Sequence, residues 1–136
     1  PRHATRSAPR HRLELALRFH HEQTSRSGVT ENVSPTGMYV LASHAPSAGE
    51  LLHFSLVDAA HSAHIEFLTE VRWGRSAPSL DHPQPGFGVH FIEIVAADHE
   101  LNALIGLLEA LKVQDARELV HVETRDNTPV AVCRFA

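Results

Sequence analysis

Alternation of apolar and polar residues is the dominant pattern along this chain, and it predicts a protein built mainly of β-strands. Apolar side chains occupy every second position in residues 13–19 and, apart from Thr69, in residues 65–73, the longest such stretch. Such alternation is typical of strands that bury one face. Four further segments with strand character are predicted at residues 29–33, 38–42, 51–57 and 87–94.

Turn and loop signals separate these predicted strands. Residues 20–28 are polar and are expected to form a turn region, and residues 58–63 and 76–85 are expected to form a turn and an exposed loop. At Pro35-Thr36-Gly37 the proline suits the first central position of a turn, and the glycine suits a later position that needs a positive φ. Gly86 and Gly88, at a strand, predict a bulge or a close approach of the backbone.

The hydrophobic period changes near residue 98, where leucine and isoleucine residues recur at helical spacing. A helix is predicted over residues 98–112, with Asp98 as its N-cap. Residues 118–123 and 130–135 then predict two short strands of a hairpin. Six strands followed by one helix favour a mainly β fold, a six-stranded antiparallel barrel with a C-terminal α-helix and a short C-terminal extension.

Composition and charge narrow the function classes. The chain has 136 residues, enough for one domain, and it holds no apolar run of membrane-spanning length. Its single cysteine, Cys133, excludes an intramolecular disulfide and suits a reducing compartment, so a cytoplasmic location is expected. Residues 1–26 hold six arginines and two glutamates, a net +4, against −8 for the rest of the chain. A basic arm on an acidic body favours a small anionic partner over a long polyanion.

Two short motifs supply candidate binding residues. Residues 1–11 show no periodicity and are expected to form a mobile arm, which carries Arg6 and Arg10 in an Arg-x-x-x-Arg spacing. The second motif, Asn32-x-Ser34-x-x-Gly37, falls at a predicted turn between strands. Guanidinium groups supply fixed charge and planar donors, Asn and Ser supply directed hydrogen bonds, and Gly permits close approach. Together they indicate a site for an anion and a guanine base.

These motifs, in this order and with these strands around them, resemble the PilZ domain, the bacterial receptor module for cyclic di-GMP. The resemblance covers roughly residues 6–112, which leaves residues 1–11 as the arm, 12–112 as the barrel with its helix, and 113–136 as the extension. It implies that the arm wraps the nucleotide onto the barrel. Arg6 and Arg10 would contact its guanines and phosphates.

For the second motif the resemblance implies one role per residue. Asn32 would accept from the guanine edge, Ser34 would donate to a phosphate or hold the turn, and Gly37 would leave room for the base. Many relatives have a second glycine where this chain has Thr36, preceded by proline, which predicts a stiffer loop. Arg12 and Arg75 are additional candidates for contact with the phosphates.

The expected function is therefore non-enzymatic binding of cyclic di-GMP, relayed through ordering of the arm to an unknown protein partner in motility or biofilm regulation. The leading alternative is a degenerate PilZ module that binds no nucleotide and serves as an adaptor between proteins. A barrel that binds nucleic acid is disfavoured by the acidic body. No residue spacing indicates a metal site, a catalytic group or a cofactor, and no membrane association is expected.

The C-terminal extension, residues 113–136, is too apolar to be expected to stay solvated. Two arrangements would bury it. It could pack on the barrel or helix of its own chain, the arrangement favoured here, or pair with a second copy and add strands across a dimer interface. The chain is accordingly expected to be a monomer or a homodimer.

Overall fold

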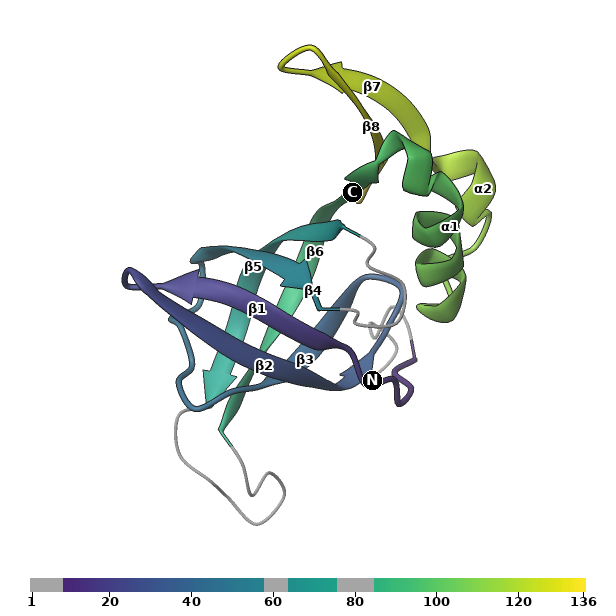
Figure 1. Ribbon diagram of the computed structural model, residues 1–136. Coiled ribbons are helices and arrows are strands. Elements are labelled where there is room, and N and C mark those ends of the chain that lie inside the picture. The colour runs from purple at the N-terminus through teal and green to yellow at the C-terminus, as the bar shows by residue number, and fades with distance from the viewer. Residues whose placement is uncertain (1–8, 58–63, 76–84) are drawn as a thin grey trace.

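Six antiparallel strands close into a barrel in the computed structural model, which describes residues 9–57, 64–75 and 85–136 (Figure 1). Their spatial order is β3-β2-β1-β4-β5-β6, and pairing between β3 and β6 closes the barrel. The predicted fold class is therefore confirmed. Of the turn predicted at 58–63 and the loop predicted at 76–85, residues 58–63 and 76–84 lie outside the described residues. The strands are β1 (Ala16–His21), β2 (Thr24–Val33), β3 (Gly37–Leu41), β4 (Leu51–Leu56), β5 (Ile65–Arg75) and β6 (Gly86–Ala97).

The barrel interior is filled by aromatic side chains from alternate strand positions. The Phe19 ring packs against Phe54 and Phe87 with ring centroids 5.1 and 5.7 Å apart, and Phe67 packs against Phe91 at 5.8 Å. These five rings are almost fully buried. Every second side chain of a strand points to the same face, so the alternation in the sequence becomes this core.

Closure of the barrel depends on a glycine at the start of β3. Gly37 lies opposite His90 of β6, and a Cβ atom on Gly37 would sit 2.2 Å from the carbonyl oxygen of Val89. No side chain fits at that separation. The prediction that Gly37 needs a positive φ is wrong, because Gly49 is the glycine that adopts one among the described residues. The glycine is required by the approach of two strands.

Gly86 and Gly88 confirm the predicted close approach of the backbone. A Cβ atom on Gly88 would lie 2.7 Å from the Trp73 indole, and one on Gly86 would lie 2.6 Å from the carbonyl oxygen of Val40. The register of β5 on β6 shifts beside Gly88, and the Trp73 ring stacks on Tyr39 with centroids 5.0 Å apart. The exposed Trp73 ring thus covers the buried Tyr39 ring.

The turn between β1 and β2 is much tighter than predicted. The polar residues 20–28 are mostly strand: β1 runs to His21, β2 starts at Thr24, and Glu22 and Gln23 form the turn with φ values of 55° and 66°. Two consecutive positive φ values match the twist of a two-residue hairpin. Neither residue is the usual Asn or Gly, and both faces of early β2 are largely exposed, so neither turn chemistry nor alternation marked this hairpin.

The predicted helix over 98–112 is confirmed in its core and wrong at its start. A 3₁₀ turn, η2 (Asp98–Glu100), leads into α1 (Leu101–Ala110). The N-cap position of this turn is Ala97, and Asp98 is the first residue inside it. The Glu100 carboxylate accepts from the backbone N–H of His64 at 2.9 Å. A short helix that the pattern did not predict, α2 (Ala116–Leu119), follows α1. None of the helices in the described residues is long and apolar enough to cross a membrane.

The C-terminal extension forms the predicted hairpin and joins the sheet of its own chain. Its strands are β7 (His121–Arg125) and β8 (Thr128–Arg134), and β8 pairs with the second half of β6. The Phe135 ring packs on Phe91 at 5.3 Å. The favoured arrangement, packing on the chain's own barrel, is therefore confirmed. Figure 1 shows the hairpin reaching beyond the barrel, next to the two helices.

Charged side chains tie this hairpin to β6. Arg125 donates to both carboxylate oxygens of Glu93 at 2.8 and 3.0 Å, and Arg134 donates to those of Glu123 at 2.6 and 2.8 Å. The Arg134 hydrogen bonds lower the pKa of Glu123 to about 2, and those from Arg125 lower the pKa of Glu93. Both carboxylates thus bind protons less readily in the fold than in the unfolded chain.

Replacing Gly37 with alanine should destabilise the fold. The added methyl group would clash with the Val89 carbonyl, and overpacking of this kind typically costs about 1–3 kcal/mol. The matched control is Gly106→Ala, where an added Cβ meets nothing within 4 Å on an exposed helix position and should stabilise by about 0.5–1 kcal/mol. Urea denaturation measures both; equal stability of the two variants would contradict this account of Gly37.

Acidification should weaken the fold through Glu123 and Glu93. Their pKa values are lowered in the fold, so between pH 4.5 and about 2 the unfolded chain takes up protons first and stability is lost. Glu123→Gln should therefore flatten the fall in urea midpoint over this range. Glu118→Gln, on an exposed residue outside the network, is the control and should leave the slope as in the unsubstituted chain.

Candidate functional site

The two sequence motifs meet at one hydrogen bond. The Arg10 guanidinium donates to the carboxamide oxygen of Asn32 at 2.7 Å, across 22 positions of sequence. Arg10 is exposed and Asn32 is half-buried, so the guanidinium is held in place and still reaches solvent. A guanidinium group is planar and carries several N–H donors, and Asn32 holds this one through one of its nitrogens. Such a group is suited to binding a phosphate or a purine edge.

Local structure explains why Arg10 and Asn32 meet. His11 and Val33 exchange backbone hydrogen bonds of 2.9 and 2.8 Å, which fasten the end of the arm beside β2. The register of β2 on β3 shifts between Thr30 and Asn32, so that a bulge precedes Asn32. Bulges of this kind re-aim side chains at the ends of strands. The expected mobile arm is thus anchored at least from His11, and residues 1–8 lie outside the described part.

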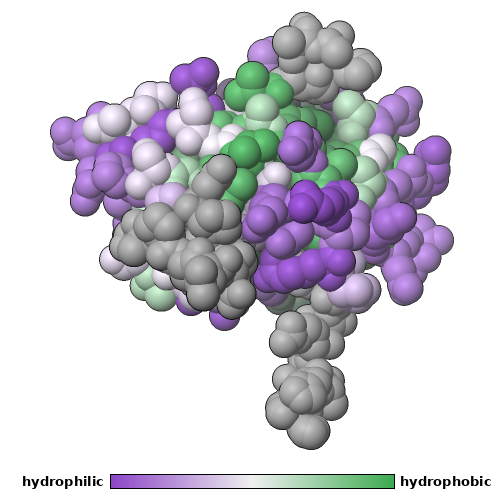
Figure 2. All heavy atoms as spheres, turned by 90° about the horizontal axis from the view of Figure 1, so that it is seen from below, coloured by the Kyte–Doolittle hydropathy of each residue, from purple (hydrophilic) through white to green (hydrophobic). Residues whose placement is uncertain are grey.

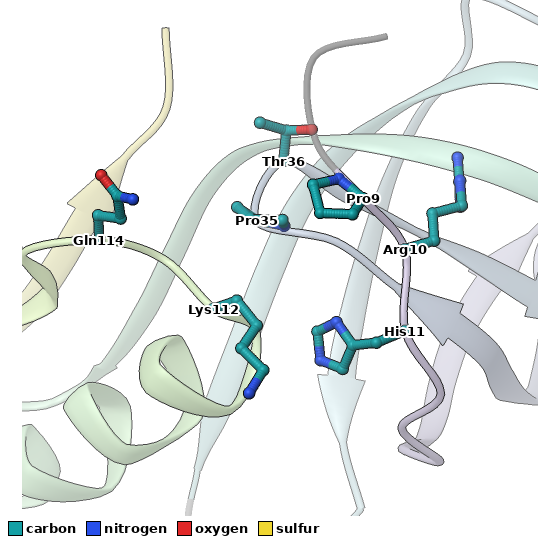
Figure 3. A pocket seen from close by; sticks show the side chains of 7 residues that line it. All are labelled: Pro9, Arg10, His11, Pro35, Thr36, Lys112 and Gln114. Atoms are coloured by element: carbon teal, nitrogen blue, oxygen red, sulfur yellow. The ribbon is translucent and has the colours of Figure 1, made fainter.

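Arg10 belongs to the lining of a pocket of about 670 Å³, a volume within the range of small-molecule sites. The pocket lies between the arm, the β2–β3 turn and the segment after α1, as Figure 3 shows. Among the described residues that line it, two are cationic and none is acidic, so it favours an anion. The lining residues are Pro9, Arg10, His11, Pro35, Thr36, Lys112 and Gln114.

Lys112 and Gln114 are pocket residues that the sequence analysis missed. They follow the end of α1, about a hundred residues from the arm, and Lys112 has a left-handed φ of 69°. In Figure 3 the Lys112 side chain faces that of His11. One signal was available, since Lys112 is the only lysine of the chain and the only basic residue between positions 76 and 116 apart from histidines.

His11 links the pocket to the end of α1. Its ring nitrogen Nε2 lies 2.9 Å from the carbonyl oxygen of Ala110, in the last turn of the helix. Carbonyl groups in that turn have no partner within the helix, so a donor from the arm satisfies one of them. His11 is therefore bonded to β2 through its backbone and to α1 through its side chain.

Ser34 holds the turn. Its hydroxyl oxygen accepts hydrogen bonds from the backbone N–H groups of Thr36 and Gly37, both at 3.2 Å, and the side chain is almost fully buried. The Ser34 backbone N–H also donates to the Gly37 carbonyl at 2.9 Å. Of the two roles expected of Ser34, the geometry supports holding the turn. Gly37 is buried, and the place of a Cβ atom on it is taken by the Val89 carbonyl of β6.

The remaining candidates are placed differently. Arg6 lies outside the described residues, and so does the side chain of Arg75. Arg12 is exposed and does not line the pocket. The backbone of Arg75 pairs with Gly86, which faces Leu41, so the register puts Arg75 at the end of β3 opposite to Gly37.

The surface seen from below the barrel is polar around its periphery, with apolar side chains showing toward its middle (Figure 2).

Within the described residues no group of three or more His, Cys, Asp and Glu side chains could hold a metal ion. Cys133 is buried, and burial raises the pKa of its thiol. A buried thiol with a raised pKa is a poor nucleophile.

Comparison with known proteins agrees with these observations. The family model described as PilZ domain matches residues 4–110, so the chain belongs to the PilZ domain family. None of the curated proteins matches the chain.

A solved structure with a similar fold is that of the Bacillus subtilis inhibitor of motility, MotI/DgrA, with a TM-score of 0.55 and 19% sequence identity. The match covers 82% of this chain and 55% of the other, so this chain spans about half the length of that protein. At this identity the likeness shows the fold alone.

Proposed function

We propose that the chain, as a PilZ domain, is a receptor for cyclic di-GMP that acts by binding and performs no chemistry. One observation carries the proposal: Arg10 of the first motif donates to Asn32 of the second at 2.7 Å, and Arg10 lines a pocket free of acidic side chains among the described residues. The proposal assigns the phosphates and guanine faces of the ligand to this pocket. PilZ domains serve as receptor or adaptor modules, which agrees with this assignment.

The residues have different tasks in this proposal. Arg10, together with Arg6 four positions earlier in the sequence, would supply guanidinium groups that stack on guanine and donate to its acceptors. Lys112 supplies a point charge for a phosphate from the other side of the pocket. The carbonyl of Asn32 is occupied by Arg10, so Asn32 acts by orienting that guanidinium.

The relay to a partner starts at His11. A ligand that draws the arm toward the pocket pulls on a segment whose end is bonded to Val33 and to Ala110. Ordering of the arm would therefore change the surface formed by the arm and the end of α1, which a partner protein would read. The motility inhibitor with the similar fold suggests the motility apparatus as the place to search for that partner.

The alternative function is that of an adaptor between proteins that binds no nucleotide. It is favoured by one observation: Ser34 and Gly37 are explained by the turn and by barrel closure, so a module without ligand would keep both. Isothermal titration of the chain with cyclic di-GMP decides between the two functions. Saturable binding that weakens with salt supports the receptor, whereas no heat at high concentrations supports the adaptor.

Arg10→Ala and Asn32→Ala should each weaken binding of cyclic di-GMP by about 1–3 kcal/mol, the usual effect of losing a hydrogen bond to a charged group. If Asn32 acts through Arg10, the double variant should lose little more than either single variant. Arg12→Ala is the control, since Arg12 does not line the pocket. Titration calorimetry measures the affinities of the unsubstituted chain and of these four variants.

Fully additive losses in that cycle would instead mean that Asn32 contacts the ligand by itself, as the sequence analysis expected. Competition with cyclic di-AMP tests guanine reading in the same assay. Equal affinity for the two dinucleotides would show that the pocket reads phosphate alone, and the proposed stacking and forking of Arg10 on guanine would be wrong.

Lys112→Gln should weaken binding and reduce its dependence on salt, because one phosphate contact is removed. Lys112→Arg should retain most of the affinity, and Arg117→Gln, a charge change of the same sign on nearby α2, should have little effect. Calorimetry at low and high salt provides both quantities. An unchanged affinity for Lys112→Gln would remove the segment after α1 from the site.

A further inference from the structure

The strand β7 forms an open edge of the sheet. The order of strands ends β6-β8-β7, and within the described part of the chain no strand pairs with the outer side of β7. Figure 1 shows the hairpin reaching away from the barrel, so this edge is accessible. An exposed edge presents unpaired backbone N–H and C=O groups to any strand that can align with it.

The hairpin geometry fixes which backbone groups point outward. Asp126 and Asn127 form a two-residue turn with φ values of 52° and 63°, so the flanking residues Arg125 and Thr128 form a hydrogen-bonded pair. Hydrogen-bonded and non-hydrogen-bonded pairs then alternate along the hairpin. It follows that the backbone groups of Val122 and Thr124 face the open edge, as do those of the extended residue Val120.

The residue of the hairpin that interrupts a hydrogen-bonded ladder, Pro129, lies on β8 and leaves the edge strand β7 uninterrupted. Pro129 lies on β8 beyond the stretch that β6 covers, and proline cannot donate to a ladder. The strand β7, which is described in full, holds no proline, glycine or bulge. Val122 lies near the middle of β7 and is 54% exposed.

We propose that β7 pairs with β7 of a second copy of this chain, antiparallel and with Val122 on the two-fold axis. In this register the outward groups of Val122 meet those of its counterpart, and Val120 meets Thr124. These are the residues whose backbone groups face the edge, so the hydrogen-bonding pattern of the hairpin and that of the dimer coincide. The two Val122 side chains lie on one face of the joined sheet and cover each other.

Hydrogen-bonding complementarity between side chains also selects this register. With Val122 on the axis, His121, whose imidazole N–H can donate, lies directly opposite the Glu123 carboxylate of the second copy, twice by symmetry. Glu123 stays anionic above about pH 2, because its hydrogen bonds with Arg134 lower its pKa. Pairing in which Glu123 itself occupied the axis would place two carboxylates opposite each other, an arrangement that destabilises a sheet. A self-complementary strand of this kind fits a second copy better than an unrelated segment, which would need a matching donor and acceptor by chance.

Cysteine cross-linking tests the register. In the proposed dimer the Cα atoms of the two Val122 residues are about 5.5 Å apart, which a disulfide can span. Val122→Cys should therefore form a cross-linked dimer under mild oxidation. Thr124→Cys should cross-link at least tenfold more slowly, because Thr124 of one copy faces Val120 of the other and the two Thr124 residues lie far apart. The one native thiol, Cys133, is fully buried and contributes little background. Equal rates for the two variants would overturn the proposal.

Sedimentation equilibrium on the full chain tests the dimer without any cross-link. The unsubstituted chain should associate with rising concentration, and Val122→Lys should stay monomeric because a lysine on an edge opposes pairing. Thr128→Lys, on the other strand of the hairpin, adds the same charge and should associate like the unsubstituted chain. A monomer at every concentration, or association of Val122→Lys at the unsubstituted level, would overturn the proposal. The inference does not rest on nucleotide binding and is tested without ligand.

Discussion

The close approach of β3 to β6 at Gly37 is the contact on which the rest of the structure depends. It closes the barrel, and it requires that the chain enter β3 without a side chain. The residues before it must then make a tight turn, whose backbone N–H groups find their acceptor in the Ser34 hydroxyl. Asn32 lies just upstream, at the end of β2 and after a bulge, so barrel closure also fixes where its carboxamide points. A binding motif and a folding requirement therefore share the same residues.

Only part of the second motif is left for a ligand once these requirements are met. Ser34 and Gly37 are buried in the turn and against β6, whereas Asn32 reaches the surface and holds Arg10. Positive charge then comes to the pocket from two distant segments, the arm and the end of α1, on a body that is otherwise acidic. The contrast between pocket and body favours a small anion, because a long polyanion would meet the acidic surface.

Alternation along the sequence predicted the barrel because each strand buries one face, and helical spacing predicted α1 for the same reason. The failures have physical causes as well. Glu22 and Gln23 form a left-handed turn although neither is the glycine or asparagine usual there. The start of β2 is polar and largely exposed on both faces, so its sequence does not alternate. Asp98 has the chemistry of a cap, but the chain enters a 3₁₀ turn there. The motifs placed Arg10 and Asn32 in one predicted site, but they did not predict the hydrogen bond between the two side chains. The place of Lys112 depends on how the chain folds back after α1.

The second half of β6 gives the C-terminal extension its place, since β8 continues the sheet there after β3 has closed the barrel against the first half. One strand thus serves the barrel at one end and carries the hairpin at the other. Between pocket and hairpin lies a short connection: Lys112 and Gln114 line the pocket, α2 follows at once, and β7 begins at His121. A ligand that engaged Lys112 would act on the segment that leads directly into β7. The proposed pocket and the proposed dimer edge are therefore neighbours along the chain, joined by a connection of a few residues that packs on α1 through Ala116.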